Sequence, residues 1–151
     1  MRVCIGADNA GYAGKEVVSE FLKTRGDELV DISTSDDEGA DFPDIAKALC
    51  RKVVAGSVER GILICGTGIG ACMAANKVHG IRAALAHDTY SAHQSVEHDD
   101  ANVLCLGAKI VGPWLMTELV GAFLEAKWAA TEEYRRRVEK LAQLELPSGR
   151  I

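Results

Sequence analysis

Residues 61–70 read GILICGTGIG, in which an apolar run that ends at Cys65 is followed by glycine at three alternate positions, Gly66, Gly68 and Gly70. The apolar run is typical of a strand that is buried on both faces, as in a parallel sheet covered by helices. A helical pattern starts directly after the glycines, so a strand, a turn and a helix N-terminus follow one another here. The segment therefore predicts one strand–helix unit of an α/β fold.

The same alternation recurs along the chain. Short runs rich in Val, Ile, Leu, Ala and Cys are each followed by apolar residues at helical spacing. The expected strands are residues 2–7, 28–32, 61–65, 82–86 and 102–106. This order predicts a doubly wound α/β domain with a parallel sheet, formed by residues 1–151 as a single domain.

Residues at the expected helix boundaries support this division. Gly26 and Gly56 stand where a left-handed residue would end the first and second helices, and Asp88 stands where a cap would open a later one. Residues 112–144 predict two helices, the second capped by Thr131. Since no strand follows, we expect the last helix to pack on a partner subunit.

The overall charge and hydropathy exclude several classes of protein. The 151 residues carry 22 acidic and 17 basic side chains, a net charge of -5, which argues against a dedicated nucleic-acid binder. No apolar run approaches the roughly 20 residues that cross a bilayer, and the N-terminus lacks the pattern of a secretory signal. We therefore expect a cytoplasmic enzyme with no nucleic-acid or membrane partner.

The five cysteines are expected to be free thiols, because their number is odd and no secretory signal precedes them. Neither CxxC spacing nor a compact set of histidines predicts a metal site. Four of the cysteines are interpreted as small core residues: Cys4, Cys50, Cys72 and Cys105. Cys65 is the exception because of its place in the chain.

Cys65 ends the expected third strand, and ligands of open parallel sheets bind beyond the carboxyl ends of the strands. The glycine turn would expose backbone N–H groups there, which favour a thiolate and stabilise negative charge on a substrate. The segment thus offers a base and an oxyanion site. Alternatively, Cys65 only completes a core strand and the glycines allow close packing.

Other polar residues next to strand ends are weaker candidates. Residues 6–11 read GADNAG, in which Asp8 and Asn9 either bind sugar hydroxyls or only cap the first helix. His98 is either a general acid or base, or a solvated residue at a helix end. Residues 135–137 are three arginines, which form either a phosphate clamp or a solvated helical face.

Together these segments resemble the ribose-5-phosphate isomerase B family, which includes the galactose-6-phosphate isomerase subunits. The resemblance extends over residues 1–145 and is most specific in residues 62–112, ILICGTGIGACMAANKVHGIRAALAHDTYSAHQSVEHDDANVLCLGAKIVG. It implies a Rossmann-like three-layer α/β/α sandwich with a five-stranded parallel sheet. It also implies a homodimer or homotetramer with active sites shared between subunits, and neither a metal nor an organic cofactor.

The resemblance assigns roles to individual residues. It implies that Cys65 moves a proton between C1 and C2, that Thr67 and Asp8 handle the hydroxyls, and that His98 of the partner subunit assists ring opening. The expected substrate-binding residues are Asn9, Gly66, Gly68, Ile69, Gly70, Asp99, Lys109, Arg136 and Arg137.

The chain departs from the family pattern mainly where the phosphate is expected. Asn9 replaces a histidine, Phe42 a tyrosine, Asp99 an asparagine, Lys109 an arginine, and Glu133 and Tyr134 an Arg-His pair, whereas Arg137 is kept. These changes concern the substrate more than the type of reaction.

The sequence therefore predicts an aldose–ketose isomerase that works through a cis-enediolate on a sugar phosphate, either ribose 5-phosphate or a close relative. The alternative substrates are erythrulose 4-phosphate, a hexose 6-phosphate or a free aldose. An alternative of another class is a non-catalytic Rossmann-like module that binds a sugar phosphate or a nucleotide.

Overall fold

Five strands form one parallel sheet in the order β2-β1-β3-β5-β4 within residues 1–33 and 41–145, the part of the chain that the computed structural model describes. The strands are β1 (Arg2–Ala7), β2 (Glu28–Asp31), β3 (Arg60–Cys65), β4 (Ala83–Leu85) and β5 (Val103–Gly107). The predicted parallel sheet is confirmed. The edge strands β2 and β4 are shorter than expected, since each pairs with a neighbour on one side only.

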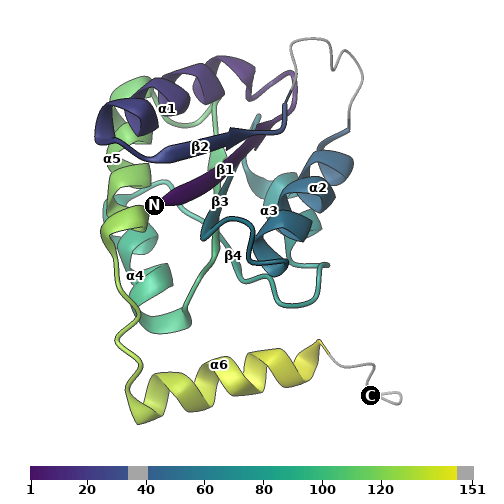
Figure 1. Ribbon diagram of the computed structural model, residues 1–151, viewed down its shortest axis with the longest axis vertical. Coiled ribbons are helices and arrows are strands. Elements are labelled where there is room, and N and C mark those ends of the chain that lie inside the picture. The colour runs from purple at the N-terminus through teal and green to yellow at the C-terminus, as the bar shows by residue number, and fades with distance from the viewer. Residues whose placement is uncertain (34–40, 146–151) are drawn as a thin grey trace.

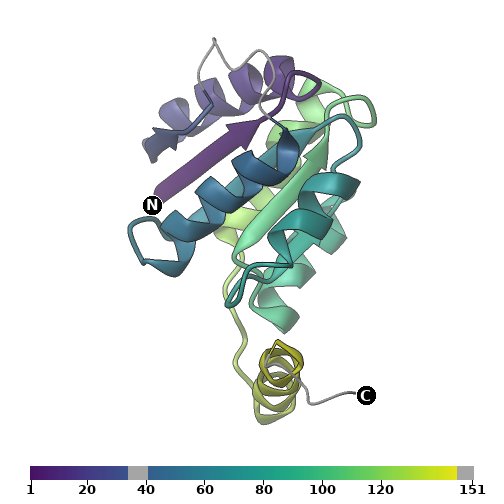
Figure 2. The same ribbon diagram turned by 90° about the vertical axis from the view of Figure 1, so that its right-hand side faces the viewer.

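Helices cover both faces of the sheet, as Figures 1 and 2 show. The helices are α1 (Tyr12–Arg25), α2 (Phe42–Val54), α3 (Ile69–Ala75), α4 (Thr89–Asp99), α5 (Pro113–Glu125) and α6 (Glu132–Leu144). One buried cluster joins the sheet to α1, α4 and α5, and a second joins the opposite face to α2 and α3. The molecule is therefore the predicted three-layer sandwich, with α6 as an addition.

Alternation along the central strands separates the two cores. On β1, Val3 and Ile5 belong to the cluster under α1 and α5, whereas Cys4 between them belongs to the cluster under α2. All three side chains are fully buried. Because successive strand residues point to opposite faces, a strand covered on both sides has to be apolar throughout.

The helix ends follow the local sequence signals. Gly26 ends α1 with φ +80°, and Gly56, just after α2, has φ +67°. The carboxylate of Asp88 accepts a hydrogen bond from the N–H of Ser91 at 2.7 Å. The hydroxyl of Thr131 accepts the N–H of Tyr134 at 3.3 Å, so the predicted cap of the last helix is confirmed.

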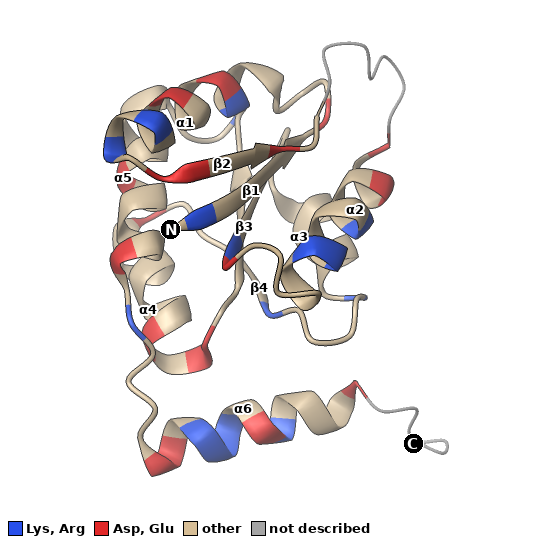
Figure 3. Ribbon diagram, in the orientation of Figure 1, with Lys and Arg blue, Asp and Glu red and all other residues tan. Residues whose placement is uncertain are grey.

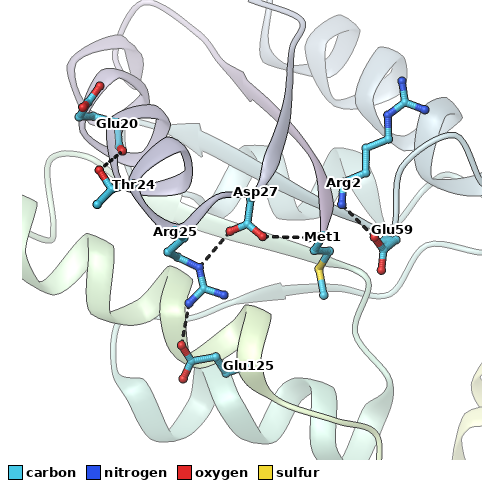
Figure 4. A network of polar contacts seen from close by, with 8 residues as sticks. All are labelled: Met1, Arg2, Glu20, Thr24, Arg25, Asp27, Glu59 and Glu125. Carbon is cyan, nitrogen blue, oxygen red and sulfur yellow. Dashed lines mark hydrogen bonds and ion pairs between the residues drawn. The ribbon is translucent and has the colours of Figure 1, made fainter.

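An ion-pair network closes the amino edge of the sheet, where β1 begins (Figure 4). The terminal amine lies 3.1 Å from Asp27, and Arg25 contacts Asp27 at 2.9 Å and Glu125 of α5 at 2.6 Å. Burial works against the charge of Asp27, but the hydrogen bonds from Arg25 and the terminal amine hold its pKa below the usual value. The network joins β1, α1 and α5 at the edge opposite the glycine turn.

Helix α6 lies across the amino edge, apart from the sandwich (Figures 1 and 2). None of its residues is buried, and Leu144 is 78% exposed. Its last turn is held by the N–H of Gly80, which donates to Glu145 at 2.9 Å. A cavity of about 570 Å³ separates α6 from the start of β4. No helix in the described residues is both long enough and apolar enough to span a bilayer.

Candidate active site

The loops that follow β1, β3 and β5 meet at the carboxyl edge of the sheet. The N–H of Ala108 donates to the carbonyl of Cys65 and the N–H of Lys109 to the carbonyl of Gly66, both at 2.9 Å. A Cβ on Gly66 would lie 3.6 Å from the Cβ of Ala10. The segments that carry Asp8, Cys65 and Lys109 are therefore neighbours.

Cys65 is the last residue of β3, and its thiol receives a backbone hydrogen bond. The N–H of Gly68 lies 3.1 Å from Sγ. Gly68 has φ +78°, and a Cβ there would lie 2.5 Å from Leu85 and 2.9 Å from the main chain of Leu106. Only glycine fits this turn, which directs an amide at the sulfur. An N–H donor stabilises a negatively charged sulfur, as a proton-abstracting thiolate requires.

The rest of the glycine turn leads into α3. Thr67 and Ile69 are exposed, and the N–H of Ile69 lies 3.4 Å from the hydroxyl of Thr67. A Cβ on Gly70 would lie 2.9 Å from the ring of Phe42. Gly70 therefore lets this ring pack against the turn, where the family pattern has a tyrosine. The predicted residues Thr67, Ile69 and Gly70 lie in the turn that follows Cys65, whose own side chain is 6% exposed.

Asp8 also shapes the carboxyl edge. Its Oδ1 accepts the N–H of Gly11 at 2.9 Å, in the residue before α1. A side chain on Gly11 would overlap the carbonyl of Ile64, so β3 and this turn are in close contact. The alternative interpretation, that Asp8 and Asn9 only cap the first helix, is wrong, because the N-cap of α1 is Gly11 and no side-chain hydrogen bond caps the helix. Its half-buried carboxylate and the exposed Asn9 lie beside the Cys65 turn.

The sequence analysis missed His87, which lies two residues after the end of β4. Its Nε2 accepts the N–H of Gly107 at 3.2 Å, which places the ring proton on Nδ1. A Cβ on Gly107 would lie 2.7 Å from the main chain of Thr67, so His87 belongs to the same edge. The rule applied to the ends of the first, third and fifth strands would have found it if extended to the fourth.

A second group of predicted residues lies at the opposite edge. Helix α4 starts after the carboxyl end of β4 and runs back along the sheet, so His98 and Asp99 reach the amino edge. There the rings of His98 and Tyr134 of α6 stack, with centroids 4.4 Å apart. Within one chain, the structure does not bring His98 and Asp99 to Cys65.

The arginines of α6 join this second group. Figure 3 shows the basic stretch of α6 after its acidic first turn. Arg137 pairs with Glu133 on the same helix, and its guanidinium lies 6.0 Å from the centroid of the Tyr134 ring. Arg136 is exposed. The predicted phosphate-binding arginines thus lie at the same edge as His98, whereas Asn9 and Lys109 lie at the same edge as Cys65.

All cysteines are free thiols, and Cys4, Cys50 and Cys105 are buried as expected. Cys72 is only partly buried, but it packs against the core cluster under α2 and α3. A hydrogen bond from the Cys105 thiol lowers the pKa of Cys72 to about 7, against the opposing effect of burial. In the described residues, no group of three or more His, Cys, Asp or Glu side chains is arranged to hold a metal ion.

The comparisons with known proteins agree with this architecture. A model of the ribose/galactose isomerase family matches residues 3–141. The D-erythrulose-4-phosphate isomerase of Pectobacterium atrosepticum is 43% identical over 129 residues, 85% of each chain. The structure of ribose-5-phosphate isomerase B from Clostridium thermocellum superposes with a TM-score of 0.92 at 42% identity, over 96% of this chain and 97% of that one.

A ligand is present in one further relative. Ribose-5-phosphate isomerase B of Mycoplasma genitalium, solved with bound ribulose 5-phosphate, has a TM-score of 0.89 at 39% identity over 95% of both chains. Similarity of this extent shows that the chain is an enzyme and not a non-catalytic binding module. The chain belongs to the ribose/galactose isomerase family, and it is a sugar-phosphate isomerase.

Proposed function

We propose that the enzyme interconverts an aldose phosphate and its ketose through a cis-enediolate, with Cys65 as the base. The hydrogen bond from the N–H of Gly68 to Sγ, 3.1 Å long at the ligand-binding edge, carries this proposal. The thiolate takes the proton from C2 of the open aldose, and negative charge develops on O1. A proton then passes from O2 to O1, and the Cys65 thiol returns its proton to C1, which leaves a carbonyl at C2.

The loops around Cys65 supply the other groups that this reaction needs. Backbone N–H groups of the 66–70 turn are assigned to the stabilisation of the enediolate oxygen. The hydroxyl of Thr67 and the carboxylate of Asp8 are assigned to the proton exchange between O1 and O2. Preorganised donors of this kind contribute to catalysis because they need no rearrangement as charge develops.

We further propose that a second copy of the chain completes each site. Six large apolar side chains are exposed around the carboxyl edge: Ile69, Met73, Leu85, Tyr90, Ile110 and Trp114, the last 88% exposed. An exposed apolar surface of this kind favours burial against a partner subunit. In a homodimer, or a homotetramer built from such dimers, the partner would bring His98 and α6 to Cys65. His98 would then donate a proton to the ring oxygen of a closed aldose while Asp8 accepts the proton of the C1 hydroxyl.

The proposed substrate is a four- or five-carbon sugar phosphate. Ribose 5-phosphate is the first candidate. Erythrulose 4-phosphate is the second, favoured by the likeness to the Pectobacterium enzyme and by the altered positions Asn9 and Glu133. The phosphate is assigned to Asn9 and Lys109 of one subunit and to Asp99 (through water), Arg136 and Arg137 of the other. Because a charged phosphate ester does not cross a bilayer unaided, we place the reaction in the cytoplasm.

A substrate panel in deuterium oxide tests the proposal. Ribose 5-phosphate, erythrulose 4-phosphate, allose 6-phosphate and free aldoses are compared by kcat/KM and by deuterium uptake at C1 and C2. We expect solvent deuterium in the product, and at least a tenfold higher kcat/KM for a four- or five-carbon phosphate than for the others. Turnover without any solvent deuterium would overturn the enediolate route. Preference for a free sugar would overturn the substrate class.

The ion pair between Glu133 and Arg137 leads to a prediction about affinity. In the Glu133→Gln variant, Arg137 no longer pairs with a carboxylate and is available to the phosphate. We expect the KM for the phosphorylated substrate to fall about threefold, which corresponds to an exposed pair of under 1 kcal/mol. Steady-state kinetics measure this, with Glu139→Gln on the same helix as the matched control. A KM that is unchanged or higher would show that Arg137 does not bind the phosphate.

A further inference from the structure

Tyr134 holds the ring of His98 between α4 and α6. The two rings are nearly parallel, with an interplanar angle of 18° and centroids 4.4 Å apart. The His98 side chain is 28% exposed, so one part of the imidazole remains open to a ligand. The contact joins α4 to α6, between which β5 and α5 lie in the chain, and it restricts the rotation of His98.

The stacked geometry leaves the proton of His98 available. The phenol oxygen lies 3.1 Å from Nε2, but in nearly parallel rings it lies above the imidazole and not in its plane. The amide nitrogen of Gln94 lies 3.0 Å from Nδ1, and as a donor it places the ring proton on Nε2. The N–H bond of an imidazole lies in the ring plane, so Nε2–H points past Tyr134.

The charged groups near His98 do not lie in the direction of its Nε2–H bond. A carboxylate oxygen of Glu97 is 3.7 Å from Nε2, beyond hydrogen-bond distance, and lies 3.6 Å from His93. Arg137 contacts the Tyr134 ring and pairs with Glu133. Stacking by Tyr134 therefore fixes the ring while the Nε2–H direction stays open to substrate.

We propose that Tyr134 is a positioning residue that aims Nε2–H of His98 at the ring oxygen of a closed sugar, and that it acts only on substrates that arrive as rings. The proposal rests on the proposed function, in which His98 opens the ring by giving its proton to O4 as the C1–O4 bond breaks. The isomerisation of an open chain by Cys65 does not need that proton.

Two sugar phosphates allow ring opening and the isomerisation of the open chain to be measured separately. Ribose 5-phosphate is closed between C1 and O4, so it has to be opened. Ribulose 5-phosphate is open, because its O5 is esterified and no other hydroxyl can form a stable ring with the C2 carbonyl. Exchange of its C1 hydrogen with solvent deuterium needs only the base. The two probes share five carbons and one phosphate and differ in ring closure.

The experiment compares Tyr134→Ala and Tyr134→Phe with the matched control Lys140→Ala, an exposed position on the same helix. We expect Tyr134→Ala to lower kcat for ribose 5-phosphate about tenfold, a typical loss when a proton donor is misplaced. Its rate of deuterium exchange into ribulose 5-phosphate should change less than twofold. Tyr134→Phe keeps the stacked ring and should retain both rates within twofold, as should Lys140→Ala.

NMR of the free enzyme provides a second measurement that does not depend on substrate. The ring protons of His98 should be shifted upfield by the Tyr134 ring, a shift that Tyr134→Phe keeps and Tyr134→Ala removes. Equal losses on both probes in Tyr134→Ala, or no upfield shift in the wild-type enzyme, would overturn the positioning role.

A parallel His98→Asn variant tells the two proposals apart. If His98→Asn is impaired on ribose 5-phosphate alone while Tyr134→Ala is impaired on neither probe, only the inference about Tyr134 fails. If His98→Asn slows both probes equally or neither, the ring-opening role in the proposed function fails, and the inference fails with it.

Discussion

Cys65→Ser is expected to lower kcat about 10³-fold with little change in KM, because a serine hydroxyl is not ionised at neutral pH and is a poor base. Loss of a positioned general base costs about 10²–10⁴-fold. The substitution keeps a hydrogen-bond acceptor for the N–H of Gly68, which lies 3.1 Å from Sγ, so the turn should retain its shape. Steady-state kinetics on the preferred sugar phosphate measure the loss.

Cys72→Ser is the matched control, since Cys72 is a partly buried free thiol on α3, the helix that follows the glycine turn, whereas Cys65 is buried. It should retain activity, although the hydrogen bond from Cys105 lowers the pKa of Cys72 to about 7. If Cys72→Ser were the inactive variant, or if Cys65→Ser remained fully active, the assignment of the base would be wrong.

Mixing Cys65→Ser with His98→Asn shows whether the loss reflects chemistry and not misfolding. If sites are shared between subunits, random exchange makes half of the dimers mixed, and one site in each mixed dimer has both native residues. Activity should therefore recover to roughly a quarter of wild type. Absence of recovery, with subunit exchange verified by native mass spectrometry, would contradict the shared site.

Gly68→Ala is expected to lower kcat more than about 100-fold, comparable to the loss of an oxyanion-hole donor, and also to destabilise the fold. A methyl group at residue 68 would lie 2.5 Å from Leu85 and 2.9 Å from the main chain of Leu106, so the turn has to shift. The positive φ of +78° adds about 1–2 kcal/mol of strain for any other residue. The shift removes the amide from the Cys65 sulfur.

Gly26→Ala is the matched control for backbone strain. Its φ is +80°, nearly that of Gly68, but no atom lies within 4 Å of the added Cβ. It should lose only about 1–2 kcal/mol of stability and keep its activity. Urea unfolding and kinetics on both variants separate strain from displacement of the turn. Equal behaviour of the two variants would show that the contacts around Gly68 do not shape the site.

Local sequence determined most of the framework. Strands that are buried on both faces must be apolar throughout, so the parallel sheet could be predicted from runs such as β3 (Arg60–Cys65). Helix ends depend on groups within a few residues, which explains the correct prediction of Gly26 and Thr131. Since parallel strands end at one edge, the proximity of Asp8 to Cys65 followed from their places in the chain.

Contacts between elements that are distant in the chain could not be predicted from local sequence. The stacking of Tyr134 on His98 joins residues 36 positions apart and depends on how α6 crosses the end of α4. The hydrogen bond from the Cys72 thiol to the carbonyl of Ala83, 3.4 Å long, depends in the same way on the packing of α3 against β4, which no local pattern encodes.

The sequence by itself determined the class of fold, the edge at which a ligand binds and the glycine turn at Cys65, because each of these depends on residues close together in the chain. Only the tertiary structure decided that His98 and the arginines of α6 lie at the opposite end of the sheet from Cys65 in the same chain. A helix that follows a parallel strand must run back along it, so a residue at its far end is carried one sheet length away from the strand's carboxyl edge.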